Sequence, residues 1–215
     1  MEERHRRIAE IALSAAGRYS LALAGGYAIQ AHGIGSRPSG DVDLFLDWGR
    51  RGEFEDAVDA VTVALEAAQM TVTVVARGET FARLLLTGLA GEDDPEKVEL
   101  AADWRSHEPV ILEIGPVLHP DDAVANKMAA LYGRALARDF LDVDAILASG
   151  RYTPERLLEL AAAADPGFEL AMFASAIGAI TQITDAAFAE YGTSAKDIRT
   201  LRHRFASWRT RLLTR

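Results

Sequence analysis

Hydrophobic and polar positions follow two different periods along the chain, and the change falls near residue 118. Before it, short apolar runs alternate with polar residues, which predicts strands because successive strand side chains point to opposite faces. Strands are predicted over 20–24, 41–46, 70–76, 80–87, 98–102 and 110–114. Helical spacing predicts helices over 2–17, 27–32 and 53–69, with a loop over 33–40 and an acidic turn over 91–96. These elements indicate a small mixed sheet flanked by helices.

After residue 118 the chain shows only the helical period. Thr153-Pro154 fits a helix start, because threonine caps free amide groups and proline is well accepted at the first helical position. Helices are predicted over 121–132, 134–148, 154–164, 168–190 and 194–213. We therefore expect an α+β protein of two domains, an α/β domain over 1–118 and a helical bundle over 119–215.

Composition narrows the possible chemistry. The chain has 215 residues, of which 49% are hydrophobic, so it can bury a full core. It has no cysteine, which excludes disulfides, thiol catalysis and cysteine metal sites. The longest apolar stretch, 170–183, is too short for a bilayer, and the first residues contain no apolar signal segment. We expect a cytoplasmic protein that does not bind membranes.

Charge is distributed unevenly along the chain. The net charge is −9, yet residues 192–215 hold seven basic residues and one acidic residue. A local cationic surface on an acidic protein is therefore expected. This basic segment fits three roles that the sequence does not separate: contact with an RNA backbone, docking of a protein partner, or a solvated helix face.

Asp41 and Asp43 form the first candidate site. On a strand, residues i and i+2 share a face, with Cα atoms about 6.7 Å apart. Two adjacent carboxylates repel each other, and a divalent cation is a natural compensation. Mg²⁺ prefers oxygen ligands and is often bound by one or two carboxylates together with substrate phosphates. The alternative is an edge strand with two solvated acids.

Gly25 and Gly26 lie between a predicted strand and a predicted helix. Glycine allows the backbone to approach a phosphate, and the amide groups that begin a helix attract one. A Gly-Gly turn followed by a DxD strand resembles the nucleotidyltransferase fold of the polymerase-beta superfamily. That resemblance implies a third carboxylate on a later strand, for which Glu113 is the candidate, so that Asp41, Asp43 and Glu113 would bind two Mg²⁺ ions.

The helical half carries further motif residues. Lys127 is followed by Arg134 and by the Arg138-Asp139-Phe-Leu-Asp142 sequence. Together with Gly-Gly and the R-x-S-x-D-x-D pattern of 37–43, this order resembles the AbiEii/MenT-type toxin nucleotidyltransferases of bacterial toxin–antitoxin and phage-abortive systems. The resemblance covers about residues 20–46 and 110–146.

The resemblance implies roles position by position. Asp41 and Asp43 match the metal-binding pair, and Lys127 matches the lysine that contacts the triphosphate. Asp142 matches the acid near the nucleotide or its lysine. Ser39 matches a Ser or Thr that would lie near the γ-phosphate or accept a regulatory group, and Arg37 fits a phosphate clamp. The nucleotide-binding set is thus Gly25, Gly26, Arg37, Ser39 and Lys127.

Lys127 and Asp142 can share a site only if the chain turns between them. On one straight helix they would lie about 22 Å apart. Gly133 is a plausible helix end, and a turn there would bring both side chains to one side. Asp139 remains a second candidate for the acidic role, and a solvated salt-bridged helix face is the alternative interpretation.

The family resemblance implies a Mg²⁺-dependent enzyme that transfers a nucleoside monophosphate from an NTP to RNA. A tRNA 3′ end is the favoured acceptor, and a cognate antitoxin protein is the expected partner. Two alternatives stay open: transfer to a small molecule such as an antibiotic or to a protein side chain, and a nucleotide-binding module without catalysis. The sequence does not identify the NTP, the antitoxin or the oligomeric state.

Overall fold

The computed structural model describes residues 1–88 and 94–214. The chain forms two compact units. The sheet unit comprises Met1–His32 and Pro38–Pro120, and the helical unit comprises Gly33–Arg37 and Asp121–Arg215. The short segment Gly33–Arg37 therefore belongs to the helical unit, although its neighbours on both sides belong to the sheet unit.

The sheet unit contains a mixed sheet in the order β3-β4-β5-β2-β1-β7-β6. β2 runs parallel to β5, and β1 runs parallel to β7, whereas the other neighbouring strands are antiparallel. The strands are β1 (Ala22–Leu23), β2 (Asp41–Asp47), β3 (Thr71–Arg77), β4 (Phe81–Thr87), β5 (Glu96–Asp103), β6 (Val110–Leu112) and β7 (Gly115–Val117). The α+β class with a mixed sheet is confirmed.

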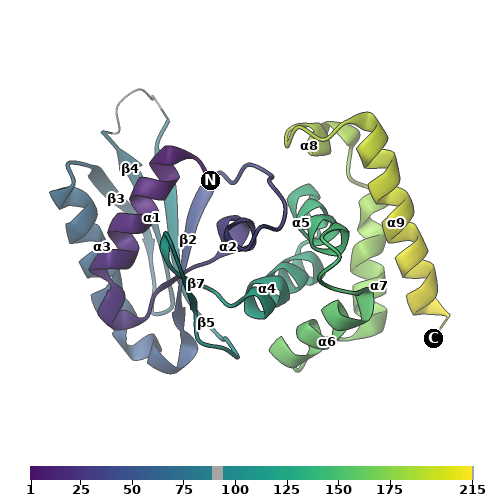
Figure 1. Cartoon of the computed structure of the whole chain (residues 1–215), viewed down its shortest axis with the longest axis horizontal. Coiled ribbons are helices and arrows are strands. Elements are labelled where there is room, and N and C mark those ends of the chain that lie inside the picture. Colours follow the sequence, from purple (N-terminus) through teal and green to yellow (C-terminus); the bar gives the residue numbers. More distant parts are fainter. Residues whose placement is uncertain (89–93, 215) are drawn as a thin grey trace. The chain divides into compact units, whose positions relative to one another are not determined.

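Alternation along the central strands separates an apolar face from a polar face. Val42, Leu44 and Leu46 of β2 are fully buried, and the alternate residues of this strand are only partly buried. Helices α1 (Glu3–Ala15) and α3 (Phe54–Ala67) pack on each other and contact the sheet (Figure 1). The apolar core of this unit consequently leaves the polar alternate positions of β2 for chemistry.

Helix α2 (Gly25–Ala31) directly follows β1. The amide of Ala24 donates to the carbonyl of Asp43 at 2.8 Å, so the antiparallel pairing of β1 and β2 continues to the residue before Gly25. The helix begins at Gly25, two residues earlier than predicted. This connection places the Gly-Gly turn beside the Asp43 end of β2.

The helical unit is built around aromatic side chains. Phe140 packs edge-on against Phe205 with ring centroids 4.9 Å apart, and Phe173 packs similarly against Trp208 at 5.2 Å. Burial of such rings is the main stabilising contribution available to a bundle of this size. Its helices are α4 (Pro120–Gly133), α5 (Ala137–Ala148), α6 (Pro154–Ala164), α7 (Leu170–Gly178), α8 (Asp185–Ala189) and α9 (Ala195–Leu213).

Three sequence predictions need correction or restriction. The predicted strand 110–114 is a hairpin of β6 and β7 with a turn at Glu113, so β7 was missed. The predicted helix 168–190 is broken into α7, a short 3-10 turn and α8. Side-chain hydrogen bonds account for the break. Arg202 donates to the carbonyls of Ile180 and Ile183, and the Thr184 side chain caps the start of α8. Residues 91–93 of the predicted acidic turn lie outside the described residues, and β5 already begins at Glu96.

Across the described residues, the structure has no helix with the length and apolar character needed to cross a membrane.

Candidate active site

Asp41 and Asp43 lie on the polar face of β2, where β5 contributes a third acid. In the parallel register, Asp41 is opposite Lys97 and Asp43 is opposite Glu99. Ligand oxygens of Asp41, Asp43 and Glu99 all lie within 4.8 Å of one another. Directly paired residues of neighbouring strands share a face, so this grouping follows from register alone. The result is a three-carboxylate cluster with the oxygen donors that Mg²⁺ prefers.

Basic side chains partly balance this cluster. The Nζ of Lys97 is 2.9 Å from Oδ2 of Asp41 and 3.6 Å from Oε1 of Glu99, and Arg83 donates to Glu99 at 2.9 Å. Burial lowers the pKa of Lys97, but the hydrogen bond and charge of Asp41 outweigh it and raise the pKa above its ordinary value. Lys97 is therefore a protonated cation between two of the three acids.

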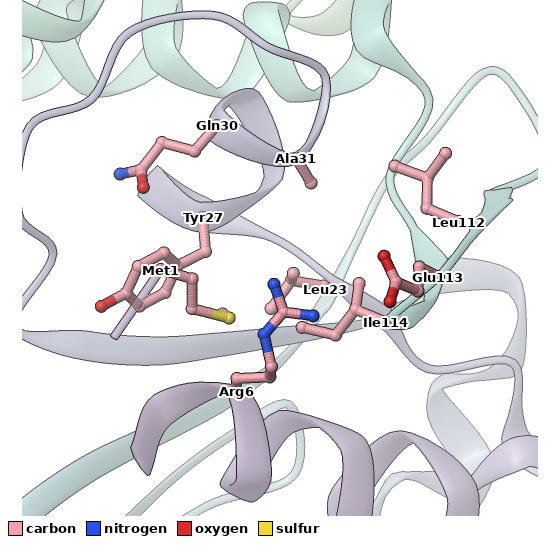
Figure 2. A pocket seen from close by; sticks show the side chains of 9 residues that line it. All are labelled: Met1, Arg6, Leu23, Tyr27, Gln30, Ala31, Leu112, Glu113 and Ile114. Atoms are coloured by element: carbon pink, nitrogen blue, oxygen red, sulfur yellow. The ribbon is translucent and has the colours of Figure 1, made fainter. Parts of the chain in front are cut away.

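Glu113 is not the third acid of this cluster. Its expected position on a strand was wrong, because the apolar run reverses at Glu113-Ile114 and Gly115 has a φ of +118°. Glu113 instead lines a separate cavity of about 270 Å³, together with Arg6, Tyr27 and Gln30 (Figure 2). Among the described residues, Glu99 groups with Asp41 and Asp43 in its place.

Gly25 touches the Asp43 carboxylate as closely as a backbone can. A Cβ atom at Gly25 would lie 1.7 Å from Oδ2 of Asp43, and the φ of Gly25 is +59°. Both the space and the left-handed backbone therefore require glycine here. Gly25 therefore brings the backbone to the edge of the carboxylate cluster. The approach of this backbone to a phosphate stays a prediction.

Ser39 and its neighbours are fixed by a buried hydrogen-bond chain. The Ser39 hydroxyl donates to Oδ1 of Asp41 at 3.3 Å, and only 4% of Ser39 is exposed. Tyr27 donates its hydroxyl to the Ser39 carbonyl at 3.0 Å and bonds Nδ1 of His5 at 2.5 Å. The other ring nitrogen of His5 lies 2.6 Å from Glu96. This chain holds the segment before Asp41 in place.

The Tyr27 hydroxyl remains a donor over the whole physiological range. Burial and the charge of Glu2 raise the pKa of Tyr27 to about 12. A neutral phenol can donate to the Ser39 carbonyl, whereas a phenolate cannot. His5 and Tyr27 therefore act on the Asp41 strand as positioning residues.

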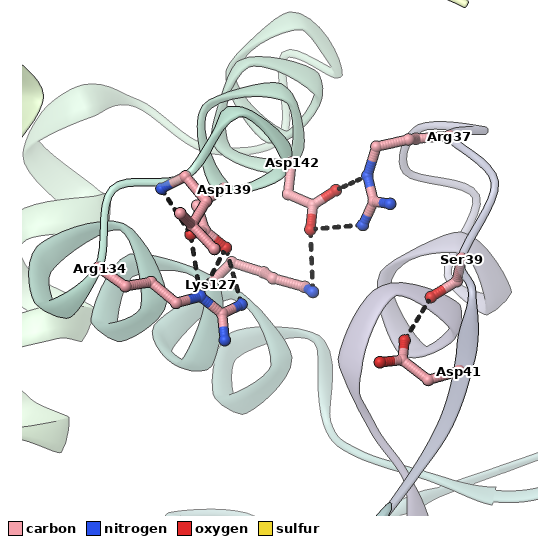
Figure 3. Close-up of polar contacts among 8 residues, drawn as sticks. Arg37, Ser39, Asp41, Lys127, Arg134, Asp139 and Asp142 are labelled. Atoms are coloured by element: carbon pink, nitrogen blue, oxygen red, sulfur yellow. Dashed lines mark hydrogen bonds and ion pairs between the residues drawn. The ribbon is translucent and has the colours of Figure 1, made fainter. Parts of the chain in front are cut away.

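In the helical unit, Lys127, Asp142 and Arg37 form one buried ion cluster (Figure 3). Nζ of Lys127 is 2.9 Å from Oδ2 of Asp142, and Arg37 donates to the two oxygens of Asp142 at 2.9 and 3.1 Å. Burial raises the pKa of Asp142, but the Lys127 and Arg37 charges outweigh it and hold the pKa below its ordinary value. Arg37 also lies over the Tyr191 ring at 5.1 Å.

The chain turns between Lys127 and Asp142 as the sequence predicted. Helix α4 ends at Gly133 and α5 begins at Ala137, so the two side chains meet although they are far apart in sequence. Asp139 has a different role: it pairs with Arg134 at 2.8 Å and accepts from the Leu136 amide at the start of α5 (Figure 3). Geometry therefore separates Asp142, which contacts the lysine, from Asp139, which stabilises the helix start.

Sequence reasoning missed Lys97, Glu99 and the His5–Tyr27 pair. Glu99 alternates with apolar residues in the strand predicted over 98–102, as Asp43 does in its own strand, and Lys97 directly precedes that predicted strand, so the pattern was an available signal. Their place beside β2 depends on strand order, which the pattern does not contain. His5 lies in a helix distant in sequence, and no local motif marks its contact with Tyr27.

Comparison with known proteins adds a family and a fold. The sequence model of a family described as nucleotidyl transferase AbiEii toxin, type IV toxin–antitoxin system, matches residues 11–200. No curated protein matches the chain.

Two solved structures resemble the whole chain. A proposed nucleotidyltransferase from H. pylori has a TM-score of 0.60 and 13% identity, covering 100% of this chain and 98% of its own. MenT4, a nucleotidyltransferase toxin from Mycobacterium tuberculosis H37Rv, has a TM-score of 0.61 and 18% identity, covering 97% and 86%. At such identities the likeness shows the fold, and the predicted nucleotidyltransferase fold is confirmed.

Proposed function

Because the chain belongs to the AbiEii family of nucleotidyltransferase toxins of type IV toxin–antitoxin systems, we propose that it transfers a nucleoside monophosphate from an NTP to RNA. A tRNA 3′ end is the proposed acceptor, and a cognate antitoxin is the proposed partner. The observation that carries the proposal is the cluster of Asp41, Asp43 and Glu99 beside Gly25, with ligand oxygens within 4.8 Å of one another.

The carboxylate cluster fits a divalent cation. It offers only oxygen donors, and its negative charge is only partly balanced by Lys97 and Arg83, which supports a role for a bound cation. Asp41, Asp43 and Glu99 would bind Mg²⁺. Bound Mg²⁺ would supply Lewis-acid stabilisation of the phosphates and of the attacking hydroxyl.

The residues of this chain prepare the transfer in three ways. Gly25 leaves room for the Asp43 carboxylate at the start of α2, and the backbone amides of Gly25 and Gly26 are proposed to bind a phosphate there. Ser39 and Tyr27 hold Asp41 in its orientation. In the overall step, the acceptor oxygen forms a bond to the α-phosphorus, the bond to the bridging oxygen breaks, and pyrophosphate leaves.

Lys127, Asp142 and Arg37 are proposed to serve the triphosphate. Lys127 and Arg37 carry two positive charges, and Asp142 orients both. Such charge-assisted bonds suit phosphate oxygens, and the planar guanidinium of Arg37 can bind two of them at once. On NTP binding, phosphate oxygens would share these donors with Asp142.

Substitution of Asp41 by asparagine tests the proposal. Purified protein is incubated with each α-³²P-labelled NTP, Mg²⁺ and bulk tRNA, and label on RNA is measured on a denaturing gel. Asp41→Asn should lower transfer by at least about 100-fold, equivalent to about 2.7 kcal/mol, because it removes a cation ligand. Asp56→Asn makes the same chemical change on an exposed position of α3 and should leave the rate unchanged.

Label on RNA that persists in Asp41→Asn would contradict the assignment. Parallel arms replace tRNA by an aminoglycoside or by a protein mixture, and label appearing only there would replace the RNA acceptor. Absence of NTP binding in calorimetry with Mg²⁺ would favour a module without catalysis.

A further inference from the structure

The helical unit contains a basic cavity that the proposed reaction does not use. It has a volume of about 580 Å³ and lies where the end of α7 and the following 3-10 turn meet α9. Helices α7 and α9 run side by side in Figure 1. Its polar lining includes Arg202, His203 and Arg209 from α9, whereas Ile177 and Ile180 of the lining are almost fully buried. The size is in the range of ordinary ligand pockets, roughly 300–1,000 Å³.

Arg202 is held rigidly at one side of this cavity. Its guanidinium donates to the carbonyl of Ile180, to the carbonyl of Ile183 at 2.7 Å, and to Asp185 at 2.7 Å. These bonds fix the side chain before any ligand arrives. A pre-organised arginine loses less conformational freedom when it binds an anion than a mobile one.

Arg209 also lines this cavity, and only its Nε atom donates a hydrogen bond within the described residues. Its Nε donates to the Ala174 carbonyl at 3.0 Å, and within the described part of the chain its two terminal nitrogens have no partner. Gly178 makes this position possible, because a Cβ there would lie 2.9 Å from Nε of Arg209. The small residue thus gives space for the guanidinium against α7.

We propose that this cavity binds a phosphodiester group of the acceptor RNA. The terminal nitrogens of Arg209 offer planar donors to phosphate oxygens, and the anchored guanidinium of Arg202 lines the same cavity. The inference rests on the proposed function, which supplies RNA as the acceptor.

Charge distribution favours a polyanion such as RNA over a basic or neutral occupant. The protein as a whole is at −9 and repels RNA, yet residues 192–215 hold seven basic residues against one acid. Among α9 cations, Arg204 is paired with Asp144 and Arg202 with Asp185. Arg209 is exposed and has no acidic partner in the described ranges. RNA therefore meets its complementary charge at this cavity.

Binding measurements test the cavity directly. Fluorescein-labelled bulk tRNA is titrated with the full chain at about 0.1 M salt, and anisotropy gives Kd. Arg209→Gln should weaken binding about tenfold and lower the slope of log Kd against log salt by about one, because one phosphate contact is lost. Arg211→Gln removes the same charge from α9 outside the cavity lining and should change Kd less than twofold.

Gly178→Ala provides a second variant that changes no charge. Alanine is acceptable in the helical backbone of Gly178, whose φ is −65°, but its Cβ would displace the Arg209 guanidinium. This variant should keep the wild-type Tm and still weaken tRNA binding severalfold. Equal losses in Arg209→Gln and Arg211→Gln, or wild-type binding in Gly178→Ala, would show that only diffuse charge attracts RNA and would overturn the cavity.

Transfer assays separate this inference from the proposed function. Arg209→Gln should raise KM for tRNA and leave kcat and the KM for NTP unchanged, whereas Asp41→Asn should lose transfer and keep the wild-type Kd for tRNA. If Arg209→Gln still transfers to RNA and has unchanged RNA affinity, RNA binding at the cavity is refuted and the proposed function stands. Cavity-dependent tRNA binding without transfer from any NTP would overturn the function alone. Loss of antitoxin binding instead of tRNA binding would assign the cavity to a protein partner.

Discussion

Replacing Lys97 by methionine removes the positive charge that lies between two acids of the carboxylate cluster. The Nζ atom is 2.9 Å from Asp41 and 3.6 Å from Glu99. A divalent cation bound by these acids must displace the ammonium or remain close to it. We expect Lys97→Met to bind divalent cations more tightly than the wild type and to be less stable without them.

The magnitude follows from the two distances. Lys97 is 32% exposed, so bulk-water screening gives a lower bound. Coulomb's law then gives about 1.4 kcal/mol for the Asp41 contact and about 1.2 kcal/mol for the Glu99 contact. Recovering the first alone in metal binding corresponds to about a tenfold lower Kd. Because the pKa of Lys97 is raised, its charge is present from neutral to mildly alkaline pH, and the effect should be constant there.

Electron paramagnetic resonance of free Mn²⁺ measures the affinity without NTP or RNA. Thermal unfolding with and without Mg²⁺ gives the stability, for which loss of about 1 kcal/mol lowers Tm by about 2–4 °C in a chain of this size. Arg83→Met is the matched control, since Arg83 pairs with Glu99 but is 43% exposed. It should change the Kd for Mn²⁺ much less. Weaker Mn²⁺ binding in Lys97→Met would refute the idea that the ammonium occupies the cation position.

Two further predictions concern residues with crowded surroundings. Gly25→Ala should weaken Mn²⁺ binding and abolish transfer, because its Cβ would lie 1.7 Å from Asp43; Gly17→Ala, with nothing within 4 Å, is the control, and equal activity of both would contradict the close approach. Asp142→Asn should lower Tm by about 10 °C, since removing one partner of a buried ion pair costs about 3–5 kcal/mol. The pKa of Asp142 is held below its ordinary 3.8, so its contribution is present above that pH and is lost only as pH falls through the lowered pKa. The stabilities of the wild type and of Asp142→Asn should therefore converge only below about pH 4. Convergence near pH 6 would contradict a lowered pKa of Asp142.

The sequence predicted what depends on local pattern. Alternation located most strands, and glycine at 133 correctly marked the turn that joins Lys127 to Asp142. The sequence-based prediction failed where contacts between residues distant in sequence determine where an element ends. The helix predicted over 168–190 breaks because Arg202 takes two of its carbonyls, and no local pattern records that bond. Likewise, the run 110–114 is apolar enough for one strand, and only Gly115 signals its reversal.

The acid at position 99 illustrates the same limit within the site. Two strands, β3 and β4, separate Glu99 from Asp43 along the sequence, but Glu99 lies directly opposite Asp43 in the sheet because β5 pairs with β2. A strand bearing Lys97 and Glu99 could have been noticed from its charged alternate positions. Choosing it over Glu113 required the strand order, which is a property of the folded chain.

Three of the acidic groups assigned to the reaction, Asp41, Glu99 and Asp142, pair with cations of their own unit. Lys97 and Arg83 accompany Asp41 and Glu99, and Lys127 and Arg37 accompany Asp142. Without such compensation, closely spaced or buried carboxylates would raise their own pKa values and lose charge. The charges of Lys127 and Arg37 hold the pKa of Asp142 below its ordinary value. In the proposed reaction, Mg²⁺ would take the place of the Lys97 ammonium at the acids, and triphosphate oxygens would share the donors of Lys127 and Arg37 with Asp142.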